Sequence, residues 1–177
     1  METEDNILNK EENKRINIAI KFDGEYLKGK EFYRNGKIRY NGEFLDEKWN
    51  GKGKEYFENG NIEFEGEYLD DERNGKGKEY YENGNLAFEG DYLKGKLNGQ
   101  GKEYYENGNI EFEGEYLDDE RNGKGKEYYE NGNLKFEGVF LKGKWNGKGS
   151  GYNLNGKLLY EGEYLDDERN GKGKEYY

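Results

Sequence analysis

Aromatic and aliphatic residues recur along this chain in short alternating segments, which are separated by turns rich in glycine and asparagine. The block GEYLDDERNGKGKEYYENGNLAFE begins at Gly66, and the spacing between successive related blocks is 24 residues. Such blocks begin at Gly42, Gly66, Gly90, Gly114, Gly138 and Gly162. A fixed period of about 20 to 50 residues is typical of a repeat array, in which each unit buries its apolar face against its neighbours.

Each copy of the block is predicted to form two β-strands joined by a tight turn. Tyr and Phe favour strands, no proline interrupts the segments, and the high density of glycine disfavours helix. Asn-Gly between alternating segments is the strongest short hairpin signal, because a type I′ turn needs positive φ at both central residues. With Asn83 and Gly84 at those positions, Tyr81 faces Leu86 and Tyr80 faces Ala87.

Continued through the second turn, where Tyr68 is set opposite Gly75, this register places four rows of side chains on one face of a sheet. The first row contains Phe57, Ile62, Tyr81, Leu86, Tyr105, Ile110, Tyr129 and Leu134. The second row alternates Glu with an aromatic: Glu55, Phe64, Glu79, Phe88, Glu103, Phe112, Glu127 and Phe136. The third row is glycine throughout, and the fourth alternates Tyr or Phe with glycine. Bare backbone in the glycine row allows neighbouring rings to lie flat across it and allows the sheet to bend.

The opposite face carries pairs of opposite charge, such as Lys78 with Glu89 and Lys76 with Asp91, and it is predicted to face solvent. The sequence therefore predicts an all-β fold: an elongated, single-layer antiparallel sheet of tandem hairpin repeats, twisted and curved. Residues 1–15 are expected to be a flexible acidic tail and residues 16–177 the repeat array. The array is divided into a capping strand at 16–23, a shortened copy at 24–41, full copies from 42, 66, 90, 114 and 138, and a partial copy at 162–177. Two turns, Asp23-Gly24 or Lys28-Gly29, could connect the first strands.

Composition changes this picture in one respect. Hydrophobic residues make up 31% and charged residues 39% of the 177 residues, values that in isolation indicate disorder. However, 16% of the residues are aromatic, which is unusual for a disordered chain. A one-layer sheet removes the conflict, because it has no second layer to cover with aliphatic side chains.

Several motifs resemble a known repeat family. The pattern Phe88-x-Gly90-x-Tyr92-x-x-Gly95, followed by Asn98-Gly99-x-Gly101 and Tyr105-x-x-Gly108, is similar to the MORN repeat over about residues 24–177. Two departures are present: Glu47, Asp71, Asp119 and Asp167 replace the turn glycine, and Glu79, Glu103 and Glu127 replace an aromatic. The segment EYYENGNLxFEG is closer to a bacterial MORN variant. The resemblance implies an elongated antiparallel sheet that serves as a scaffold or interaction module, and the bacterial variant suggests an antitoxin or immunity-type inhibitor as an alternative.

The glutamates of the second row are the candidate site. They are Glu55, Glu79, Glu103 and Glu127, and they recur at about 10 Å because each repeat adds two strands spaced about 4.7–4.9 Å apart. Flanked by Phe and expected to be unpaired, they could dock Lys or Arg of a partner by carboxylate pairing and cation–π contact. The candidate aromatic contacts are Phe64, Phe88, Phe112, Phe136, Tyr68, Tyr92, Tyr116 and Tyr164. The alternative is that water solvates the carboxylates and that the tyrosines pack on glycine.

Catalysis is not expected. The chain has no His and no Cys, so imidazole bases, thiol nucleophiles and Cys/His zinc sites are excluded, and no cofactor or metal is predicted. Acidic turns such as Asp118-Asp119-Glu120 lack the spacing of a calcium loop, and they alternate with basic turns in a 48-residue super-repeat. A glycan-binding module, with sugars stacked on the aromatic rows, is a third alternative.

The partner is expected to be a protein that carries basic groups. A formal net charge of −11 disfavours nucleic acid and anionic membranes. The acidic N-terminal segment has no apolar core of a signal peptide, so a cytoplasmic protein is expected. The last strand, at residues 171–177, has no predicted cap, so we expect either self-association, through that edge or through the aromatic face, or a chain that is a fragment.

Overall fold

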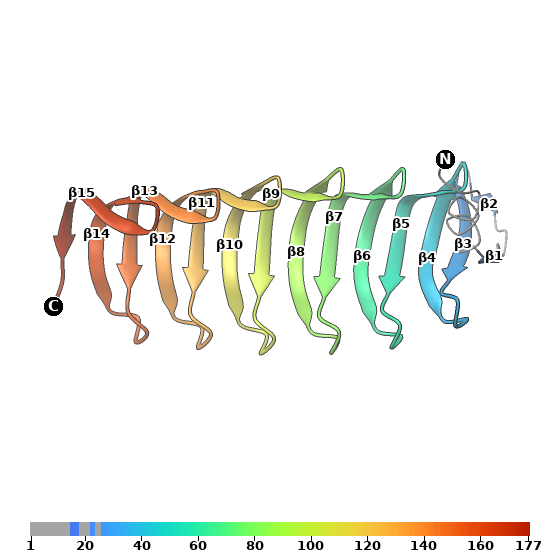
Figure 1. Cartoon of the computed structure of the whole chain (residues 1–177), viewed down its shortest axis with the longest axis horizontal. Coiled ribbons are helices and arrows are strands. Elements are labelled where there is room, and N and C mark those ends of the chain that lie inside the picture. The colour runs from blue at the N-terminus through green and yellow to red at the C-terminus, as the bar shows by residue number, and fades with distance from the viewer. Residues whose placement is uncertain (1–14, 18–21, 24–25) are drawn as a thin grey trace, which may run out of the picture.

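The computed structural model describes residues 15–17, 22–23 and 26–177, and these form one antiparallel sheet (Figure 1). β1 (Arg15–Asn17) and β2 (Phe22–Asp23) both pair with β3 (Tyr26–Phe32). The next strands are β4 (Ile38–Leu45), β5 (Lys48–Tyr56), β6 (Ile62–Leu69), β7 (Glu72–Tyr80), β8 (Leu86–Leu93) and β9 (Lys96–Tyr104). They are followed by β10 (Ile110–Leu117), β11 (Glu120–Tyr128), β12 (Leu134–Leu141), β13 (Lys144–Tyr152), β14 (Leu158–Leu165) and β15 (Glu168–Glu175).

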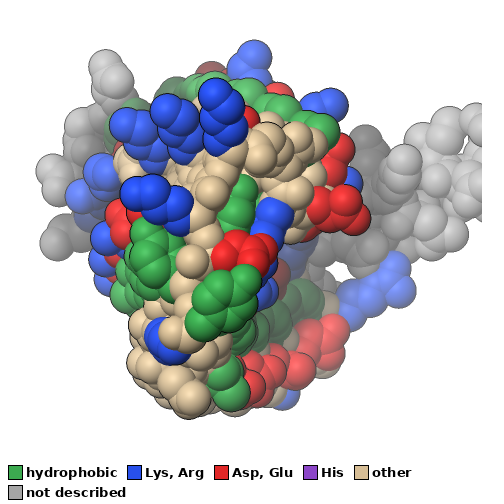
Figure 2. All heavy atoms as spheres, turned by 90° about the vertical axis from the view of Figure 1, so that its left-hand side faces the viewer, with side chains coloured by type: hydrophobic (Ala, Val, Ile, Leu, Met, Phe, Trp, Pro, Cys, Tyr) green, Lys and Arg blue, Asp and Glu red, His purple; other side chains and the backbone are tan. Residues whose placement is uncertain are grey.

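The predicted single-layer architecture is confirmed. From β3 to β15 each strand pairs with the next one along the chain, so the sheet grows in one direction and its strands curve around the long axis (Figure 1). Seen from the β15 end, charged side chains lie around much of the rim of the cross-section (Figure 2). The described residues contain no helix of the length and apolarity needed to cross a membrane.

The central rows of the predicted register are also confirmed. Glu79 pairs with Phe88, and Gly77 pairs with Gly90. On the other face Lys78 pairs with Glu89, again as predicted. Since side chains alternate along a strand, one face of the sheet carries the aromatic and glutamate residues and the other carries the Lys–Glu pairs. We call these the aromatic face and the ladder face.

The turn at Asn83-Gly84 differs from the prediction. Gly84 N–H donates to the Tyr81 carbonyl, and Tyr81 N–H donates to the Asn85 carbonyl, so the loop has three residues. Of these three only Gly84 has positive φ, at 92°. A bulge then pairs Tyr80, not Tyr81, with Leu86. The type I′ turn predicted here is therefore wrong, and the loop is the three-residue form with glycine in the left-handed region.

The two-residue turn occurs at the other end of the strands. Asp70 and Asp71 have φ of 52° and 71°, and Leu69 pairs directly with Glu72. This short turn puts Tyr68 opposite Arg73, whereas Gly75 was predicted at that position. Gly75 instead takes φ of 85° within a bulge. The bulge directs the Arg73 side chain onto the aromatic face.

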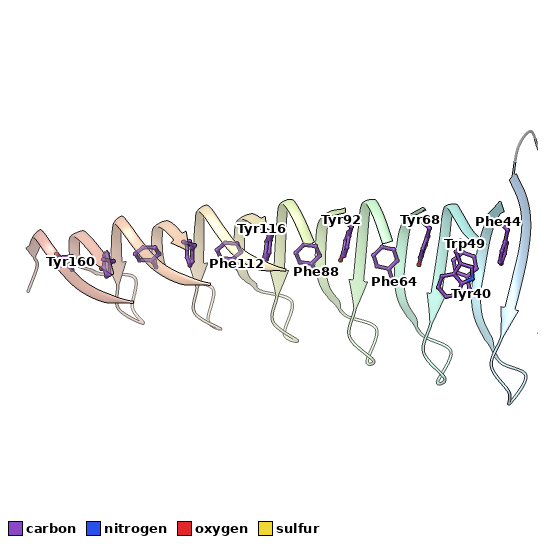
Figure 3. Packing of buried hydrophobic residues seen from close by; sticks show 13 residues of the cluster. Tyr40, Phe44, Trp49, Phe64, Tyr68, Phe88, Tyr92, Phe112, Tyr116 and Tyr160 are labelled. Carbon is purple, nitrogen blue, oxygen red and sulfur yellow. The ribbon is translucent and has the colours of Figure 1, made fainter. Parts of the chain in front are cut away.

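The predicted row of glycines has the expected role. A Cβ on Gly66 would lie 2.7 Å from Phe64 Cζ, and a Cβ on Gly77 would overlap the same ring. Neighbouring rings meet edge to face, for example Phe64 and Tyr92 at 5.2 Å between centroids (Figure 3). Thirteen buried aromatic residues form one continuous cluster along the sheet, which is the core of the protein.

Both ends of the array were also predicted. The expected tail, residues 1–15, and part of the expected capping strand, residues 18–21, lie outside the described residues except for Arg15. Lys28 and Gly29 lie within β3, so the turn expected there as one alternative is not formed, while Gly24 of the other alternative lies outside the described residues. The copy boundaries stay a prediction.

Candidate functional site

A second set of side chains closes the aromatic face. These residues follow the two-residue turn in each repeat, and we call them the covering residues: Trp49, Arg73, Leu97, Arg121, Trp145 and Arg169. Trp49 stacks on Tyr40 with 4.2 Å between centroids, and the Arg73 guanidinium lies 4.3 Å from the centre of Phe64. Each covering residue packs on the aromatic row, so side chains of the same chain cover this face.

The glutamate row is paired within the chain, which contradicts the expectation that it is unpaired. Arg73 Nε binds Glu55 at 3.0 Å, and the Arg73 guanidinium also binds Glu79. Arg121 binds Glu103 in the same way. Glu127 binds Lys135 at 2.8 Å. The expectation failed because cations reach the row from the covering residues and from residues ten positions before them.

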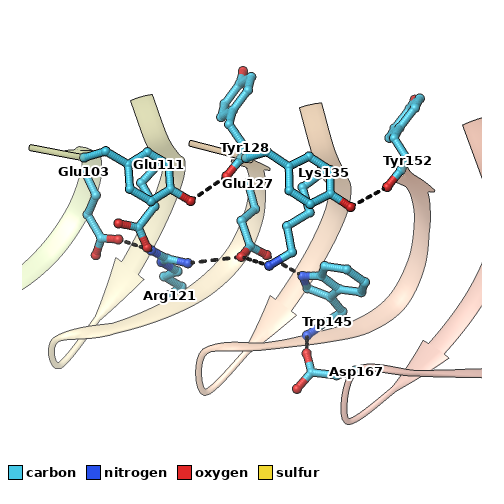
Figure 4. Close-up of polar contacts among 11 residues, drawn as sticks. Glu103, Glu111, Arg121, Glu127, Tyr128, Lys135, Trp145, Tyr152 and Asp167 are labelled. Atoms are coloured by element: carbon cyan, nitrogen blue, oxygen red, sulfur yellow. Dashed lines mark hydrogen bonds and ion pairs between the residues drawn. The ribbon is translucent and has the colours of Figure 1, made fainter. Parts of the chain in front are cut away.

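Figure 4 shows one of these networks. The Arg121 guanidinium lies among three carboxylates, those of Glu103, Glu111 and Glu127. Trp145 Nε1 donates to Glu127 at 2.7 Å. Burial by itself lowers the pKa of the Arg121 guanidinium, but the bound carboxylates outweigh this effect and raise it, so the side chain stays charged. Each arginine therefore holds neighbouring repeats together through the carboxylates that it shares.

The aromatic rings proposed as contacts are buried. Phe64, Phe112 and Phe136 have no exposed surface, and the remaining five candidates are at most 5% exposed. The interpretation of these rings as an exposed contact surface is therefore wrong, and so is an open strip on which sugars could stack. They pack on glycine and on one another, which was the alternative reading for the tyrosines.

The ladder face is the open side of the sheet. Lys54 binds Glu65 at 2.8 Å, and the Tyr80 hydroxyl donates to the same carboxylate at 2.7 Å. These two bonds lower the pKa of Glu65, while burial and the bond to Glu65 raise the pKa of Tyr80 to about 12. The arrangement recurs at Glu89 with Tyr104 and at later copies, so the face presents a regular ladder of charge.

A groove of about 1170 Å³ runs along this face, over the backbone of the glycine row. Its lining contains eight lysines and five glutamates, which gives it a net positive charge in a protein whose formal net charge is −11. The lysines are Lys52, Lys54, Lys76, Lys78, Lys102, Lys124, Lys126 and Lys148.

A stripe of leucines occurs on the ladder face, one before each two-residue turn. We call it the leucine stripe, and it contains Leu45, Leu69, Leu93, Leu117, Leu141 and Leu165. Five of the six are about half exposed, at 49–51%, and Leu45 is 38% exposed. A regular row of exposed leucines is unusual on a protein with so few aliphatic residues, and exposed apolar surface of this kind often marks an interaction site.

The acidic and basic turns complement each other as expected. Lys48 binds Asp70, Lys96 binds Asp118, and Lys144 binds Asp166, at 3.4 to 3.6 Å. In addition, the Asp71 carboxylate accepts the Trp49 backbone N–H at 2.8 Å. Within the described residues, no group of three or more Asp or Glu side chains could hold a metal ion.

The covering residues are the functional residues that the sequence reasoning missed. Their signal was present: at one position of the 24-residue period the chain has only Trp, Arg or Leu. The residue ten positions earlier mostly changes with it, since Arg39 and Lys135 accompany Trp, and Glu63 and Glu111 accompany Arg73 and Arg121, although Leu159 accompanies Arg169.

Comparison with protein families gives matches along the array. The model described as "MORN repeat" matches residues 64–86, 88–110, 112–134, 136–150 and 160–177. The model described as "MORN repeat variant" matches residues 26–46, 49–70 and 145–166. A comparison with curated proteins gave no match. Nothing in these matches links the chain to antitoxin components.

Proposed function

Because the chain belongs to the MORN repeat family, whose repeats generally act as protein- or membrane-interaction modules, we propose that it is a non-enzymatic scaffold that binds a protein partner. The observation that supports this proposal is that one face of the sheet is covered by its own side chains and the other is open. The aromatic face is occupied by the core and the covering residues. The ladder face keeps a groove and a row of exposed leucines that no described residue covers.

The ladder face suits a protein partner better than a lipid surface. A net charge of −11 repels anionic headgroups over the whole molecule. Half-exposed leucines spaced one per repeat offer apolar anchors, and the ladder between them offers charged groups of both signs. Apolar anchors with a charged surround are the usual composition of a protein interface.

The partner can be sought with variants restricted to the leucine stripe. Wild-type protein and a triple variant, Leu69→Ser with Leu93→Ser and Leu117→Ser, are used as bait, and the captured partner is then purified and titrated directly. We expect the triple variant to lose at least tenfold in affinity. A matched control, Leu154→Ser, changes a leucine that is 56% exposed but lies outside the stripe, and it should leave the affinity unchanged.

Two results would overturn the proposal. One is equal binding by the wild type and the triple variant, which would place the interface elsewhere. The other is co-sedimentation with anionic vesicles in the absence of any saturable protein partner, which would assign the chain to the membrane-binding class.

A further inference from the structure

We call the space between two successive glutamates of the glutamate row an interval, and within residues 26–177 one interval lacks a cation. Each of the other intervals receives one, from a covering arginine or from the basic residue ten positions before a covering tryptophan. Between Glu79 and Glu103 the covering residue is Leu97, and the residue ten positions before it is Ala87. Neither can supply a charge, so the regular series is interrupted at one place.

Each of the two carboxylates that border this interval is bound by an arginine of the neighbouring interval and by none within this one. Glu79 is bound by Arg73, and Glu103 is bound by Arg121. Their side chains are 34% and 26% exposed, against 17% for Glu55 and 13% for Glu127. This exposure leaves both carboxylates accessible to a further donor.

Carboxylates outnumber cations on both sides of the interval. Arg73 serves Glu55, Glu63 and Glu79 together. Burial raises the pKa of Glu63, and the negative charge of Glu55 raises it further. The surrounding field is therefore negative and favours an added positive group.

One buried hydroxyl, that of Tyr92, lies at the same place, whereas Tyr116 pairs with Arg121 in the next interval. Among the described residues, the buried side-chain polar atoms without a hydrogen-bond partner are those of Tyr92 and Tyr116, each 4% exposed. Both rings contact Phe88 edge to face, at 5.7 and 5.4 Å between centroids. Tyr92 also pairs across its hairpin with Leu97. An unpartnered buried hydroxyl is costly, so the Tyr92 hydroxyl beside Leu97 favours the approach of a further acceptor.

The equivalent position one repeat earlier shows what is missing. There the Tyr68 hydroxyl donates to Glu55 at 3.0 Å, and Arg73 Nε binds the same carboxylate oxygen at 3.0 Å. The guanidinium holds the carboxylate within reach of the hydroxyl. Leu97 cannot hold Glu79 in this way, so no cation fixes that carboxylate beside the Tyr92 hydroxyl.

We propose that the interval between Glu79 and Glu103 is a binding site for an arginine side chain of the partner protein. The proposal rests on the protein-binding function proposed above and adds a contact on the aromatic face to the one on the ladder face. The guanidinium binds the two carboxylates from the open side, as a fork of N–H donors suits carboxylate oxygens. Leu97 offers its apolar side chain to the aliphatic part of the incoming arginine, and Glu79, drawn inward, accepts the Tyr92 hydroxyl.

The site can be tested without knowing the partner. N-acetyl-arginine amide is titrated into protein labelled at tyrosine, and the ring resonances are followed by NMR. We expect the Tyr92 and Tyr116 resonances to shift saturably with a dissociation constant on the order of 1–10 mM, the range of a weak single-residue ligand. Added salt should weaken the binding, because the contacts are between charges.

Three variants make the test specific, each checked for folding by circular dichroism. Leu97→Arg supplies the missing cation and should abolish the shifts. Leu154→Arg adds the same charge at an exposed leucine outside both the site and the leucine stripe and should leave them unchanged. Ala87→Glu copies the arrangement at Glu63 and Glu111 and should tighten binding about 3- to 10-fold, as expected of one added charge-assisted contact.

The absence of saturable shifts in the wild type would overturn the site. Equal loss of binding in Leu97→Arg and Leu154→Arg would also overturn it, since net charge alone would then explain the effect. Failure of the proposed function gives a different result: the amide binds and depends on these variants, while no protein partner depends on the leucine stripe.

Discussion

Glu63 and Glu65 are two residues apart in β6, but a bulge at Glu63 turns its side chain to Arg73 on the aromatic face, while Glu65 contacts Lys54 on the ladder face. Glu65 accepts bonds from Lys54 and Tyr80, which lower its pKa. Glu63 is partly buried beside Glu55, and both effects raise its pKa despite Arg73 nearby. At the scale of single residues, the ladder face therefore stabilises its carboxylates, while the aromatic face carries more carboxylates than its cations neutralise.

This contrast predicts opposite effects for the same substitution. The folded protein binds the Glu63 proton more tightly than the unfolded chain does, so ionisation of Glu63 lowers stability as pH rises from about 4.5 through its raised pKa. Glu63→Gln should therefore raise the free energy of unfolding at pH 7, by about 0.3–0.5 kcal/mol, because a side chain that is 37% exposed is strongly screened. The gain should disappear below about pH 4.5.

Glu65→Gln is the matched comparison. The pKa of Glu65 is lowered in the folded state, so its charged form adds stability above about pH 4.5, and this contribution is lost as pH falls through the lowered pKa. Glu65→Gln should lower the free energy of unfolding at pH 7. Urea unfolding of both variants at pH 7 and at pH 3.5 measures the two effects, and the same sign for both substitutions at pH 7 would contradict this account.

At the scale of elements, strand identity and central register followed from periodicity, but the turn types did not. Asn-Gly usually indicates a type I′ turn, yet the Asn83 side chain accepts the Asn85 backbone N–H at 2.9 Å and closes a three-residue loop in which only Gly84 has positive φ. At Asp71, by contrast, a residue other than glycine takes positive φ. Its positive φ is accompanied by a bond from Trp49 N–H in the previous repeat, a contact that no local pattern encodes.

The candidate site was only partly predictable for the same reason. The glutamate row was identified from register, because Glu and Phe alternate with the strands. The pairing of these glutamates with arginine was not identified. Arg73 reaches Glu55 and Glu79 only because the two-residue turn and the bulge at Gly75 redirect its side chain. A pairing that depends on turn type cannot be inferred before the turn is known.

Neighbouring hairpins are also tied together by tyrosine hydroxyls, and Phe57 is a natural exception. Tyr81 donates to the Tyr104 carbonyl at 2.5 Å, and Tyr105 donates to the Tyr128 carbonyl at 2.8 Å. Phe57 occupies the equivalent position and has no hydroxyl. Phe57→Tyr should add a bond to the Tyr80 carbonyl and raise the free energy of unfolding by about 0.5–1.5 kcal/mol.

The reverse change supplies the control for this prediction. Tyr105→Phe should lower the free energy of unfolding by a similar amount, about 0.5–1.5 kcal/mol. Thermal and urea unfolding measure both variants. If Phe57→Tyr is neutral while Tyr105→Phe is destabilising, the hydroxyl does not reach the carbonyl at this repeat, and the equivalence of the hairpins fails there.

At the scale of the whole molecule, the structural unit is longer than the 24-residue repeat. Lys48 binds Asp70 across neighbouring turns, and the same pair recurs 48 residues later as Lys96 with Asp118. Covering arginines recur with the same spacing, at Arg73 and Arg121. A pair of repeats is therefore the smallest unit that carries the full set of contacts between neighbours.

Deleting one repeat or two should distinguish these units. Removal of residues 66–113 joins Glu65 to Gly114 and brings Arg121 and Asp118 to the positions of Arg73 and Asp70, so every contact is restored. Removal of residues 66–89 brings Leu97 to that position and leaves Glu55 and Glu63 without a guanidinium. We expect the shorter protein to have the higher free energy of unfolding.

Urea unfolding followed by circular dichroism measures both deletions. Stability in repeat proteins is approximately a sum over units and their interfaces, so a loss that simply scales with the number of residues removed would contradict the two-repeat unit. The 24-residue deletion should regain stability when Leu97→Arg is added, because the missing cation is then returned.

The most direct test of the account is hydroxyl-radical footprinting read out by mass spectrometry, since it reports the accessibility of both faces in one experiment. The leucines of the stripe, about half exposed, should be oxidised readily, and Phe64, Phe88, Phe112 and Phe136 should be protected until the protein unfolds. Oxidation of these phenylalanines in the folded protein, at rates comparable to those of the leucines, would contradict the assignment of the aromatic face as a covered core and of the ladder face as the open surface.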